Sequence, residues 1–411
     1  MKRVVITGLG IISSIGNNVT KVLDSLMQGK SGVTFSSKMK KMGIKSQIWG
    51  NIKNIDYKQK INIKYHRFMN IASMYTYLSM KQAIKSAKLQ ETLYKKNPKI
   101  GVIVGSSISS PRTHYMSVNT IKNKKKNRHL SPYTIIRTMS SNISACLTSF
   151  FNIYGISYSI NSACASSAHC IGHAFNLIQS GKQDLIFSGG GEEVTWELAY
   201  YFDAIKALSR KYNHIPEQAS RAYDICRDGF VLSGGAGIIV VEELNHALSR
   251  GAKIYAEIIG YGASSDGFNM VLPSIEGAIR CMKLSMQKLS DFKIDYLNTH
   301  GTSTLQGDIR ELHAIVKVFN KNNIPMISST KSMTGHALGA SGVQEIIYTI
   351  LMMNNNFIAP SINIDVIDPL AENMNIIVKN IKKKINIAMS NSFGFGGTNA
   401  TIIIKNYEIS L

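Results

Sequence analysis

The stretch YSINSACASSAHCIGHAFNLIQ, residues 158–179, decides the fold class and holds the first candidate for chemistry. Residues 158–161 favour a short strand, and residues 163–179 favour a helix of mostly small side chains that begins at once. Small neighbours let the chain turn sharply at Cys164 and project its sulfur. We expect the helix N-terminus to direct its amide groups and the positive end of its dipole at that sulfur.

Strand-like runs alternate with helical patterns along most of the chain, which favours an α/β fold with covered sheets. Several of these runs end at glycine-containing turns, such as residues 105–107 and 189–191. The strands predicted from the sequence span residues 4–7, 99–104, 158–161, 185–187, 237–241, 255–261, 296–299, 326–329 and 401–404.

The second half of the chain repeats the pattern of the first. The segment ISSTK at 327–331 precedes a small-residue helix at 339–353, as residues 158–161 precede theirs. Self-similarity of this kind predicts an internal duplication. We place one half at residues 1–250 and the other at residues 251–411, packed as one body because no Pro- or Ser-rich linker separates them.

Composition excludes several classes of protein. The 411 residues are 44% hydrophobic and 18% charged, enough for a large core and unlike a disordered or fibrous chain. No apolar run approaches 18 residues, so we expect no membrane-spanning helix. The apolar start at 4–12 is interrupted by Gly8 and Gly10 and lacks a small-residue cleavage site, unlike a signal peptide. Five scattered cysteines without a CxxC pair predict a reduced, cytoplasmic protein.

The formal net charge of +22 admits two interpretations. The 47 basic residues suit a partner with an acidic surface or a nucleic acid. The excess is mostly Lys, accompanied by abundant Asn and Ile along the whole chain, which indicates compositional drift as the main cause. Residues 122–128 (KNKKKNR) form one denser basic run, but no nucleic-acid recognition pattern accompanies it.

The turn at Gly8 and Gly10 does not predict a dinucleotide site. The third glycine of that fingerprint falls at Ser13, and no suitably placed acid ends a second strand. We interpret the two glycines as a tight strand exit.

Cys164 has two possible roles. A structural, buried thiol is the commoner one, as for the cysteines at 146, 170, 226 and 281. A nucleophile needs thiolate, and lowering a pKa of about 8.5 by about 1.5 units makes a thiol roughly half ionised at neutral pH.

Two histidine segments and a glycine-rich turn favour the nucleophile. His300 follows a strand in NTHGTST at 298–304, and His336 lies in KSMTGHALGASG at 331–342, with glycines that let a ligand approach. NSFGFGGTN at 391–399 is a glycine-rich turn without the Lys-Ser/Thr of a phosphate loop.

Together these four segments closely resemble the β-ketoacyl-acyl-carrier-protein synthases, condensing enzymes of the thiolase superfamily. The resemblance covers residues 1 to 407, and AHCIG at 168–172 and GVQE at 342–345 are most similar to the synthase I branch. It implies the five-layered αβαβα thiolase-like fold made of two similar halves, in a homodimer. It also implies decarboxylative condensation of acyl- with malonyl-carrier protein in type II fatty acid synthesis, without a metal or further cofactor.

The resemblance assigns roles to individual residues. Cys164 is the acylated nucleophile, and His300 and His336 stabilise the enolate left by decarboxylation. Lys331 provides positive charge and hydrogen bonding around His336. A second oxyanion site is formed by the backbone N–H groups of Cys164 and Phe395. Glu345 and Asp308 are the implied partners of Lys331. Thr302 and Thr304 correspond to positions that bind pantetheine. The residues implied for the acyl pocket are Ile108, Met139 of the partner subunit, Leu198, Phe202, Phe230, Phe393 and Phe395.

The resemblance also implies an acidic carrier protein as the partner. Its basic docking positions correspond to Lys45, Lys64, Arg67, Lys125 and Arg128. We expect neither nucleic acid nor membrane as a partner, although a basic nucleic-acid-binding protein is the alternative from a different class. Thiolases need a second cysteine near the C-terminus, and none follows Cys281. Ile108 stands where synthase I usually has glycine and synthase II isoleucine, which leaves synthase II-like chain-length specificity as an alternative.

Overall fold

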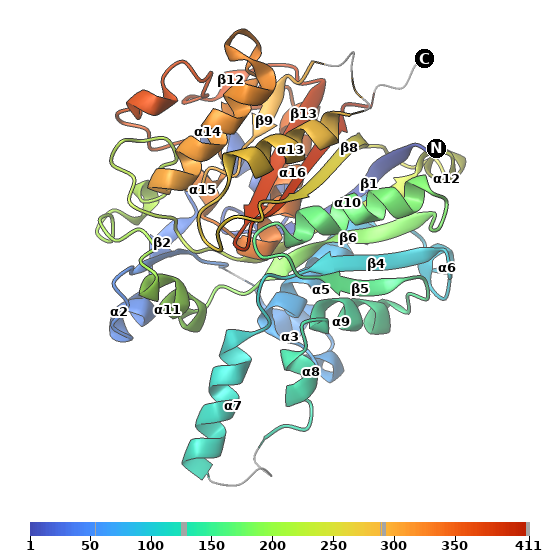
Figure 1. Ribbon diagram of the computed structural model, residues 1–411. Helices are drawn as coiled ribbons and strands as arrows, with labels where there is room; N and C mark the ends of the chain where they lie inside the picture. The colour runs from blue at the N-terminus through green and yellow to red at the C-terminus, as the bar shows by residue number, and fades with distance from the viewer. Residues whose placement is uncertain (54, 125–129, 288, 290–292, 408–411) are drawn as a thin grey trace.

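In the computed structural model, which describes residues 1–407 except 54, 125–129, 288 and 290–292, the chain forms five alternating layers of helices and sheets (Figure 1). The ten strands of the main sheet follow the order β10-β9-β13-β14-β8-β1-β7-β6-β4-β5. The predicted α/β class and the αβαβα layering are confirmed.

The sheet consists of two halves with the same topology. Each half orders its strands as third, second, fourth, fifth and first along the chain, and each has the same parallel and antiparallel pairs. Within the described part of the main sheet, the halves are joined where Val4 to Ile6 of β1 oppose Ala256 to Ile258 of β8. The strands are β1 (Val4–Ile12), β4 (Ile100–Gly105), β5 (Ser157–Ile160), β6 (Leu185–Glu192) and β7 (Gly235–Glu243) in one half, and β8 (Ala256–Ser265), β9 (Tyr296–Asn298), β10 (Met326–Ser328), β13 (Ile387–Gly394) and β14 (Thr398–Lys405) in the other.

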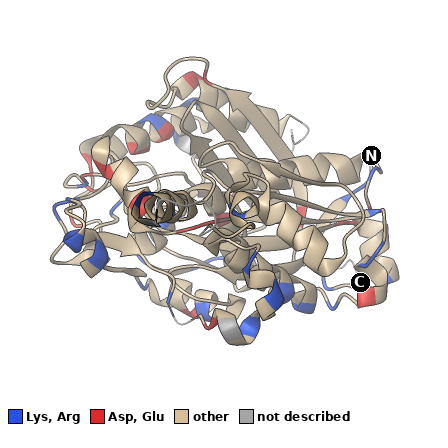
Figure 2. Ribbon diagram, turned by 90° about the horizontal axis from the view of Figure 1, so that it is seen from below, with Lys and Arg blue, Asp and Glu red and all other residues tan. Residues whose placement is uncertain are grey.

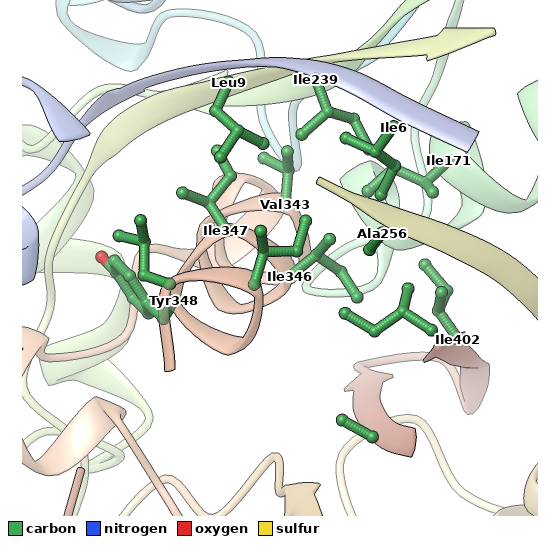
Figure 3. Close-up of a cluster of buried hydrophobic side chains, with 14 of the residues drawn as sticks. Ile6, Leu9, Ile171, Ile239, Ala256, Val343, Ile346, Ile347, Tyr348 and Ile402 are labelled. Atoms are coloured by element: carbon green, nitrogen blue, oxygen red, sulfur yellow. The ribbon is translucent and has the colours of Figure 1, made fainter. Parts of the chain in front are cut away.

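Two helices, α10 (Ser166–Gln179) and α16 (Ser341–Asn354), form the central layer between the sheet halves. They approach closely because a Cβ on Gly342 would lie 2.9 Å from the Cβ of Ala168. Thirteen residues of α16 are buried, which suits a helix covered on all sides. Figure 3 shows its apolar side chains, including Val343 and Ile347, against residues of both halves such as Leu9 and Ile402.

The outer layers cover the other faces of the sheet halves. Helix α5 (Ile71–Ser86) packs on β1 and β7, and α13 (Ile275–Met286) packs on β8 and β14. The remaining helices are α1 (Val19–Gln28), α2 (Ser37–Lys41), α3 (Tyr57–Lys60), α4 (Ile63–His66), α6 (Glu91–Tyr94), α7 (Pro111–Lys124), α8 (Thr134–Thr138), α9 (Asn142–Phe151), α11 (Trp196–Ala204), α12 (Leu244–Ser249), α14 (Leu305–Phe319) and α15 (Lys331–Thr334), with short 3-10 turns at Pro216–Gln218, Lys321–Asn323, Leu338–Ala340 and Pro369–Ala371. Two small sheets pair β2 (Val33–Phe35) with β3 (Ile48–Gly50), and β11 (Phe357–Ile358) with β12 (Ile381–Lys382).

Gly8 and Gly10 do not mark a strand exit, contrary to our interpretation. Both lie inside β1, which continues to Ile12. A Cβ on Gly10 would lie 1.8 Å from the carbonyl oxygen of Ser79, so the glycines let helix α5 lie directly on the strand. The turn expected at 391–399 is also shorter, because β13 runs to Gly394 and β14 begins at Thr398.

No described helix has both the length and the apolar character needed to cross a membrane. The division into halves at residues 1–250 and 251–411 stays a prediction.

Candidate active site

Cys164 lies in a sharp elbow between β5 and α10. Ala163 adopts a left-handed backbone conformation (φ 48°), which a small side chain tolerates at least cost. Helix α10 begins at Ser166 rather than at residue 163, so Cys164 precedes it. Gly394 packs against the elbow, where a Cβ would lie 3.1 Å from the backbone nitrogen of Cys164. The elbow at Cys164 and the turn after β13 therefore lie in direct contact.

The thiol of Cys164 is not activated in the way we expected. Burial raises its pKa to about 12, which outweighs the lowering effect of the charge on Lys331; the carboxyl of Glu192 raises it further. The backbone N–H groups of Phe395 and Cys164 donate to the sulfur and favour the thiolate, but with smaller effect. The nearby donors and charge therefore do not bring the pKa of this thiol below its usual value, because Cys164 is only 9% exposed and low polarity disfavours the charged form.

His300 and His336 face the thiol. The sulfur of Cys164 and a ring nitrogen of each histidine all lie within 4.8 Å of one another, and the ring centroids of the histidines are 5.1 Å apart. Burial and the charge on Lys331 hold the pKa of both imidazoles well below the usual range. Both rings are therefore neutral at neutral pH, and a neutral imidazole can donate one N–H.

Each histidine is hydrogen-bonded to neighbouring segments, His336 through its ring and backbone and His300 through its backbone. The Nδ1 of His336 lies 2.9 Å from the hydroxyl of Ser341, and its backbone N–H donates to Val231 at 2.8 Å. The backbone N–H of His300 donates to Glu311 at 2.9 Å. The Nε2 atom of His336 is thus free to face Cys164, while its Nδ1 atom is held.

Lys331 and Glu345 form an ion pair, and each side chain is 2% exposed. The other expected partner, Asp308, is elsewhere: it pairs with Arg227, whose Nε atom lies 3.4 Å from Asp308 Oδ2. The expectation that Asp308 supports Lys331 is wrong, since α14 points its carboxylate at the loop before it. The backbone N–H groups of Thr302 and Ser303 donate to this carboxylate at 2.9 and 3.1 Å.

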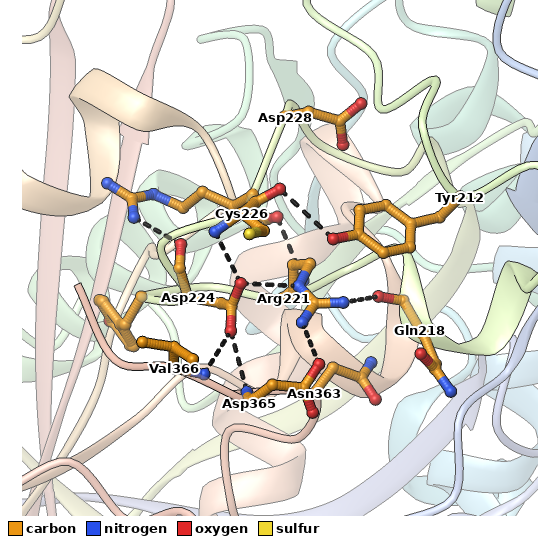
Figure 4. A network of polar contacts seen from close by, with 12 residues as sticks. Tyr212, Gln218, Arg221, Asp224, Cys226, Asp228, Asn363, Asp365 and Val366 are labelled. Carbon is orange, nitrogen blue, oxygen red and sulfur yellow. Dashed lines mark hydrogen bonds and ion pairs between the residues drawn. The ribbon is translucent and has the colours of Figure 1, made fainter.

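A second network of buried charges, around Arg221 and Asp224 (Figure 4), contacts the same loop through Ser303. Arg221 donates to Asp224 at 3.0 Å, and its backbone N–H donates to the hydroxyl of Ser303 at 3.1 Å. Asp224 accepts from the backbone N–H groups of Asp365 and Val366 at 2.9 and 3.1 Å. Ser303 has a positive φ of 72°, so this network holds the loop in a conformation that it would otherwise avoid.

An apolar cavity of about 180 Å³ leads to the histidines. It is lined by His300 and His336, by Thr302 and Thr304, and by Phe393 and Phe395. Phe395 is 39% exposed, which places it between the cavity and solvent. The two predicted pantetheine residues and two of the predicted acyl-pocket residues, Phe393 and Phe395, thus line one cavity.

Most of the predicted acyl-pocket residues form one apolar cluster with Cys164. Leu198 and Phe230 are buried there, and Ile108 and Phe202 pack against it half-buried. The rings of Phe202 and Phe395 lie 6.3 Å apart. Met139 follows α8 and is half-buried; its role in a partner subunit stays a prediction.

The basic docking positions are exposed where the structure describes them. Lys45, Lys64 and Arg67 are on the surface, and the guanidinium of Arg67 lies 4.9 Å from the ring centroids of Phe68 and Tyr133. Lys125 and Arg128 lie outside the described residues. Figure 2 shows Lys and Arg spread over several helices and loops rather than gathered on one.

Sequence reasoning missed Glu192, Glu311 and His169. Glu192 is buried and accepts from the backbone N–H groups of Ser107 at 2.8 Å and Gly339 at 3.1 Å, which ties the segments of Ile108 and His336 together. Glu311 accepts from Asn391 at 3.0 Å besides His300. The pair Glu192-Glu193 at the end of an apolar strand was the available signal, because buried acids need partners.

The comparisons with known proteins agree with this geometry. Residues 1–247 match the family "Beta-ketoacyl synthase, N-terminal domain", and residues 255–365 match "Beta-ketoacyl synthase, C-terminal domain". The chain therefore belongs to the β-ketoacyl synthase family. It is 60% identical over 407 residues to 3-oxoacyl-[acyl-carrier-protein] synthase 1 of Buchnera aphidicola subsp. Baizongia pistaciae, covering 99% of this chain and all of that one.

Two further similarities are informative. The chain is 55% identical to 3-oxoacyl-[acyl-carrier-protein] synthase 1 of Escherichia coli K12, over 99% of its length and the whole of that protein. A solved ketosynthase chain, described as a type II PKS acyl-carrier protein in complex with its ketosynthase bound to the hexaketide, has a TM-score of 0.89 at 26% identity, covering 99% of this chain and all of that one.

Proposed function

We propose that this protein is a 3-oxoacyl-acyl-carrier-protein synthase of the synthase I type. It condenses an acyl group with malonyl-carrier protein, with loss of carbon dioxide, in type II fatty acid synthesis. The observation that carries this proposal is the convergence of one buried thiol with two neutral imidazoles and two backbone N–H donors. The name of the Buchnera relative supports the same activity.

The first half of the reaction moves an acyl chain onto Cys164. Its sulfur attacks the carbonyl carbon of the acyl thioester, the pantetheine sulfur of the carrier leaves, and the thiol's proton passes to that leaving sulfur. Negative charge develops on the carbonyl oxygen during the attack. The N–H groups of Phe395 and Cys164 already point at the sulfur, so they are placed to stabilise this charge.

The second half forms the carbon–carbon bond. Breaking the bond to the malonyl carboxylate releases carbon dioxide, and the electron pair passes to the α-carbon as an enolate. That carbon attacks the acyl carbonyl, and the sulfur of Cys164 leaves and takes up a proton. Neutral imidazoles at His300 and His336 suit this step, because they donate N–H bonds to the enolate oxygen without needing to remove a proton from carbon.

The carrier protein delivers both substrates on its pantetheine arm, and we assign no further cofactor to the reaction. Thr302 and Thr304 line the cavity through which such an arm would reach Cys164. Lys45, Lys64 and Arg67 are exposed and suit an acidic carrier. The solved ketosynthase neighbour is described in complex with an acyl-carrier protein, which supports this class of partner.

We propose a homodimer as the working form. Strand β5 ends the sheet, and among the described residues no strand pairs with its outer edge. Helix α7 contacts α8 and projects from the body (Figure 1), with Met116 and Val118 about half exposed and Ile135 of α8 exposed as well. An open strand edge and apolar groups of this kind are features that a second copy would cover.

We place the protein in the cytoplasm. All five cysteines are free thiols, which suits a reducing compartment.

Mass spectrometry tests the proposed function directly. Incubation with acyl-carrier protein should add the acyl mass to Cys164, and later addition of malonyl-carrier protein should release carbon dioxide and 3-oxoacyl-carrier protein. Cys164→Ala should abolish the acyl adduct. Acylation that persists in this variant would overturn the assignment of the nucleophile, and absence of any condensation product would overturn the function.

A further inference from the structure

His169 connects the helix of the nucleophile with the turn that supplies a backbone donor. It lies five residues after Cys164, inside α10. Its Nδ1 atom lies 2.7 Å from the hydroxyl of Tyr261 on β8, and its Nε2 atom lies 3.0 Å from the hydroxyl of Thr398 on β14. His169, on helix α10, is thus hydrogen-bonded to two strands of the second sheet half.

Thr398 is the first residue after the turn that carries Phe395. Its backbone pairs with Gly394 across the β13–β14 hairpin, so only residues 395–397 separate the two. The N–H of Gly397 donates to Gly394 at 3.0 Å, which closes the turn. A displacement of Thr398 therefore moves the N–H group of Phe395 relative to the sulfur of Cys164.

Two further backbone hydrogen bonds of this turn run to a different place. The carbonyl of Gly397 accepts from the N–H of Asp266 at 2.7 Å, and the N–H of Gly396 donates to Met270 at 2.8 Å. Both partners belong to the chain after β8. They hold the turn within its own half but do not relate it to α10, whereas His169 does.

The ring of His169 is held firmly. The ring of Tyr261 packs directly on α10, since a Cβ on Gly172 would lie 2.2 Å from atoms of this ring. Burial lowers the pKa of His169 to about 4, so the imidazole is neutral and both of its nitrogens are occupied by hydroxyl groups. The contact does not change with pH in the range where an enzyme of this kind works.

We propose that His169 is a positioning residue for the oxyanion site. Through Thr398 it fixes the N–H of Phe395, and through α10 it fixes the N–H of Cys164, so it sets the distance between the two donors. This rests on the proposed function, in which the two donors serve attack on the acyl carbonyl. The enolate formed from malonyl is stabilised by His300 and His336 instead, whereas the ring nitrogens of His169 bond to Tyr261 and Thr398.

The test separates the two half-reactions. Acyl transfer is measured as the single-turnover rate at which Cys164 gains the acyl mass, and decarboxylation as carbon dioxide released from malonyl-carrier protein. Loss of one oxyanion donor costs about 100- to 1000-fold in rate, so displacing it should cost less. We expect His169→Ala to slow acyl transfer about 10- to 100-fold and to change decarboxylation less than about threefold.

Three variants complete the experiment. Thr398→Val keeps the shape of the side chain and removes only its hydroxyl, so it should slow acyl transfer selectively even if His169→Ala folds poorly. The double variant should be no slower than His169→Ala alone, because both changes break the same link. His173→Ala, one turn further along α10 with its ring 5.6 Å from that of Tyr158, should leave both half-reactions unchanged.

The positioning role would be overturned if the variants slowed acyl transfer and decarboxylation equally. It would also be overturned if neither Thr398→Val nor His169→Ala slowed acyl transfer. Failure of the unmodified protein to acylate Cys164 would instead overturn the proposed function.

Discussion

Arg227 and Asp308 form an ion pair inside the protein, with Nε 3.4 Å from Oδ2 and side-chain exposures of 1% and 0%. The pair joins the chain after the 216–218 turn to the first turn of α14. Its carboxylate also accepts the N–H groups of Thr302, Ser303 and Tyr223. The pair therefore helps to hold Thr302, which lines the cavity that leads to His300.

Removing one partner of this pair should destabilise the protein. Arg227→Met leaves the buried carboxylate of Asp308 without its counter-charge, a change that typically costs about 3–5 kcal/mol. We expect a lower midpoint of unfolding in denaturant and a raised KM for acyl-carrier protein, since Thr302 lines the cavity. Arg280→Met, an exposed contact on α13, is the control. Unchanged stability in Arg227→Met would contradict the energetic role of the pair.

His300 and His336 should matter more for decarboxylation than for acyl transfer. Replacing either by Ala removes an N–H donor to the enolate oxygen, and we expect carbon dioxide release to fall about 100-fold or more. Some acylation of Cys164 should remain, because the backbone donors are untouched. His313→Ala, exposed on α14, is the matched control. Carbon dioxide release at the unmodified rate in both variants would show that the imidazoles have another role.

The reactivity of Cys164 should rise steeply with pH. Its pKa is raised to about 12, so the thiolate fraction increases about tenfold per pH unit throughout the range below that value. We expect alkylation by iodoacetamide, followed by mass spectrometry at pH 7, 8 and 9, to show this increase without levelling off. Alkylation of the exposed Cys226 in the same sample shows that the reagent is active at each pH. A plateau near pH 7 would show that the thiol is activated after all.

Ile108 should limit the length of acyl chains. It packs against the cluster of Cys164, Leu198 and Phe230, and its backbone carbonyl accepts from the hydroxyl of Ser106 at 3.2 Å. A fixed backbone leaves only side-chain rotation to enlarge the pocket, at about 0.5–1.5 kcal/mol. Ile108→Gly should raise relative activity on long acyl primers and spare short ones.

Ile108→Val removes a single methyl group and should change the chain-length profile little. An identical profile in the wild-type protein and Ile108→Gly would mean that this residue does not line the end of the pocket.

The open edge of β5 should be the dimer contact. Tyr158 is 36% exposed on this strand, so Tyr158→Glu would place charges against each other across a two-fold axis. We expect sedimentation to show dissociation of the dimer. Leu248→Glu, on the exposed side of α12, should leave the mass of the assembly unchanged. A dimer that persists in Tyr158→Glu would place the interface elsewhere.

The sequence by itself determined the fold class and pointed to Cys164, His300 and His336 as the candidate reacting groups. Strand, turn and small-residue helix recur at 158–179 and 327–353, and their spacing is enough to predict duplication because each pattern is local. Small residues at the elbow predicted a sharp turn that projects the sulfur of Cys164, and glycines beside His300 and His336 predicted that a ligand can approach closely. These signals depend on neighbours in the chain.

Tertiary structure decided the electrostatics and the partners. The pKa of Cys164 is raised rather than lowered because segments far apart in the sequence remove water from the sulfur, an effect that no local pattern encodes. Asp308 pairs with Arg227 rather than Lys331, and His169 meets Thr398, 229 residues away, only because the two halves fold against each other. The residue types could be identified in the sequence, but the distances between them depend on how two sheet halves of the same topology pack around α10 and α16.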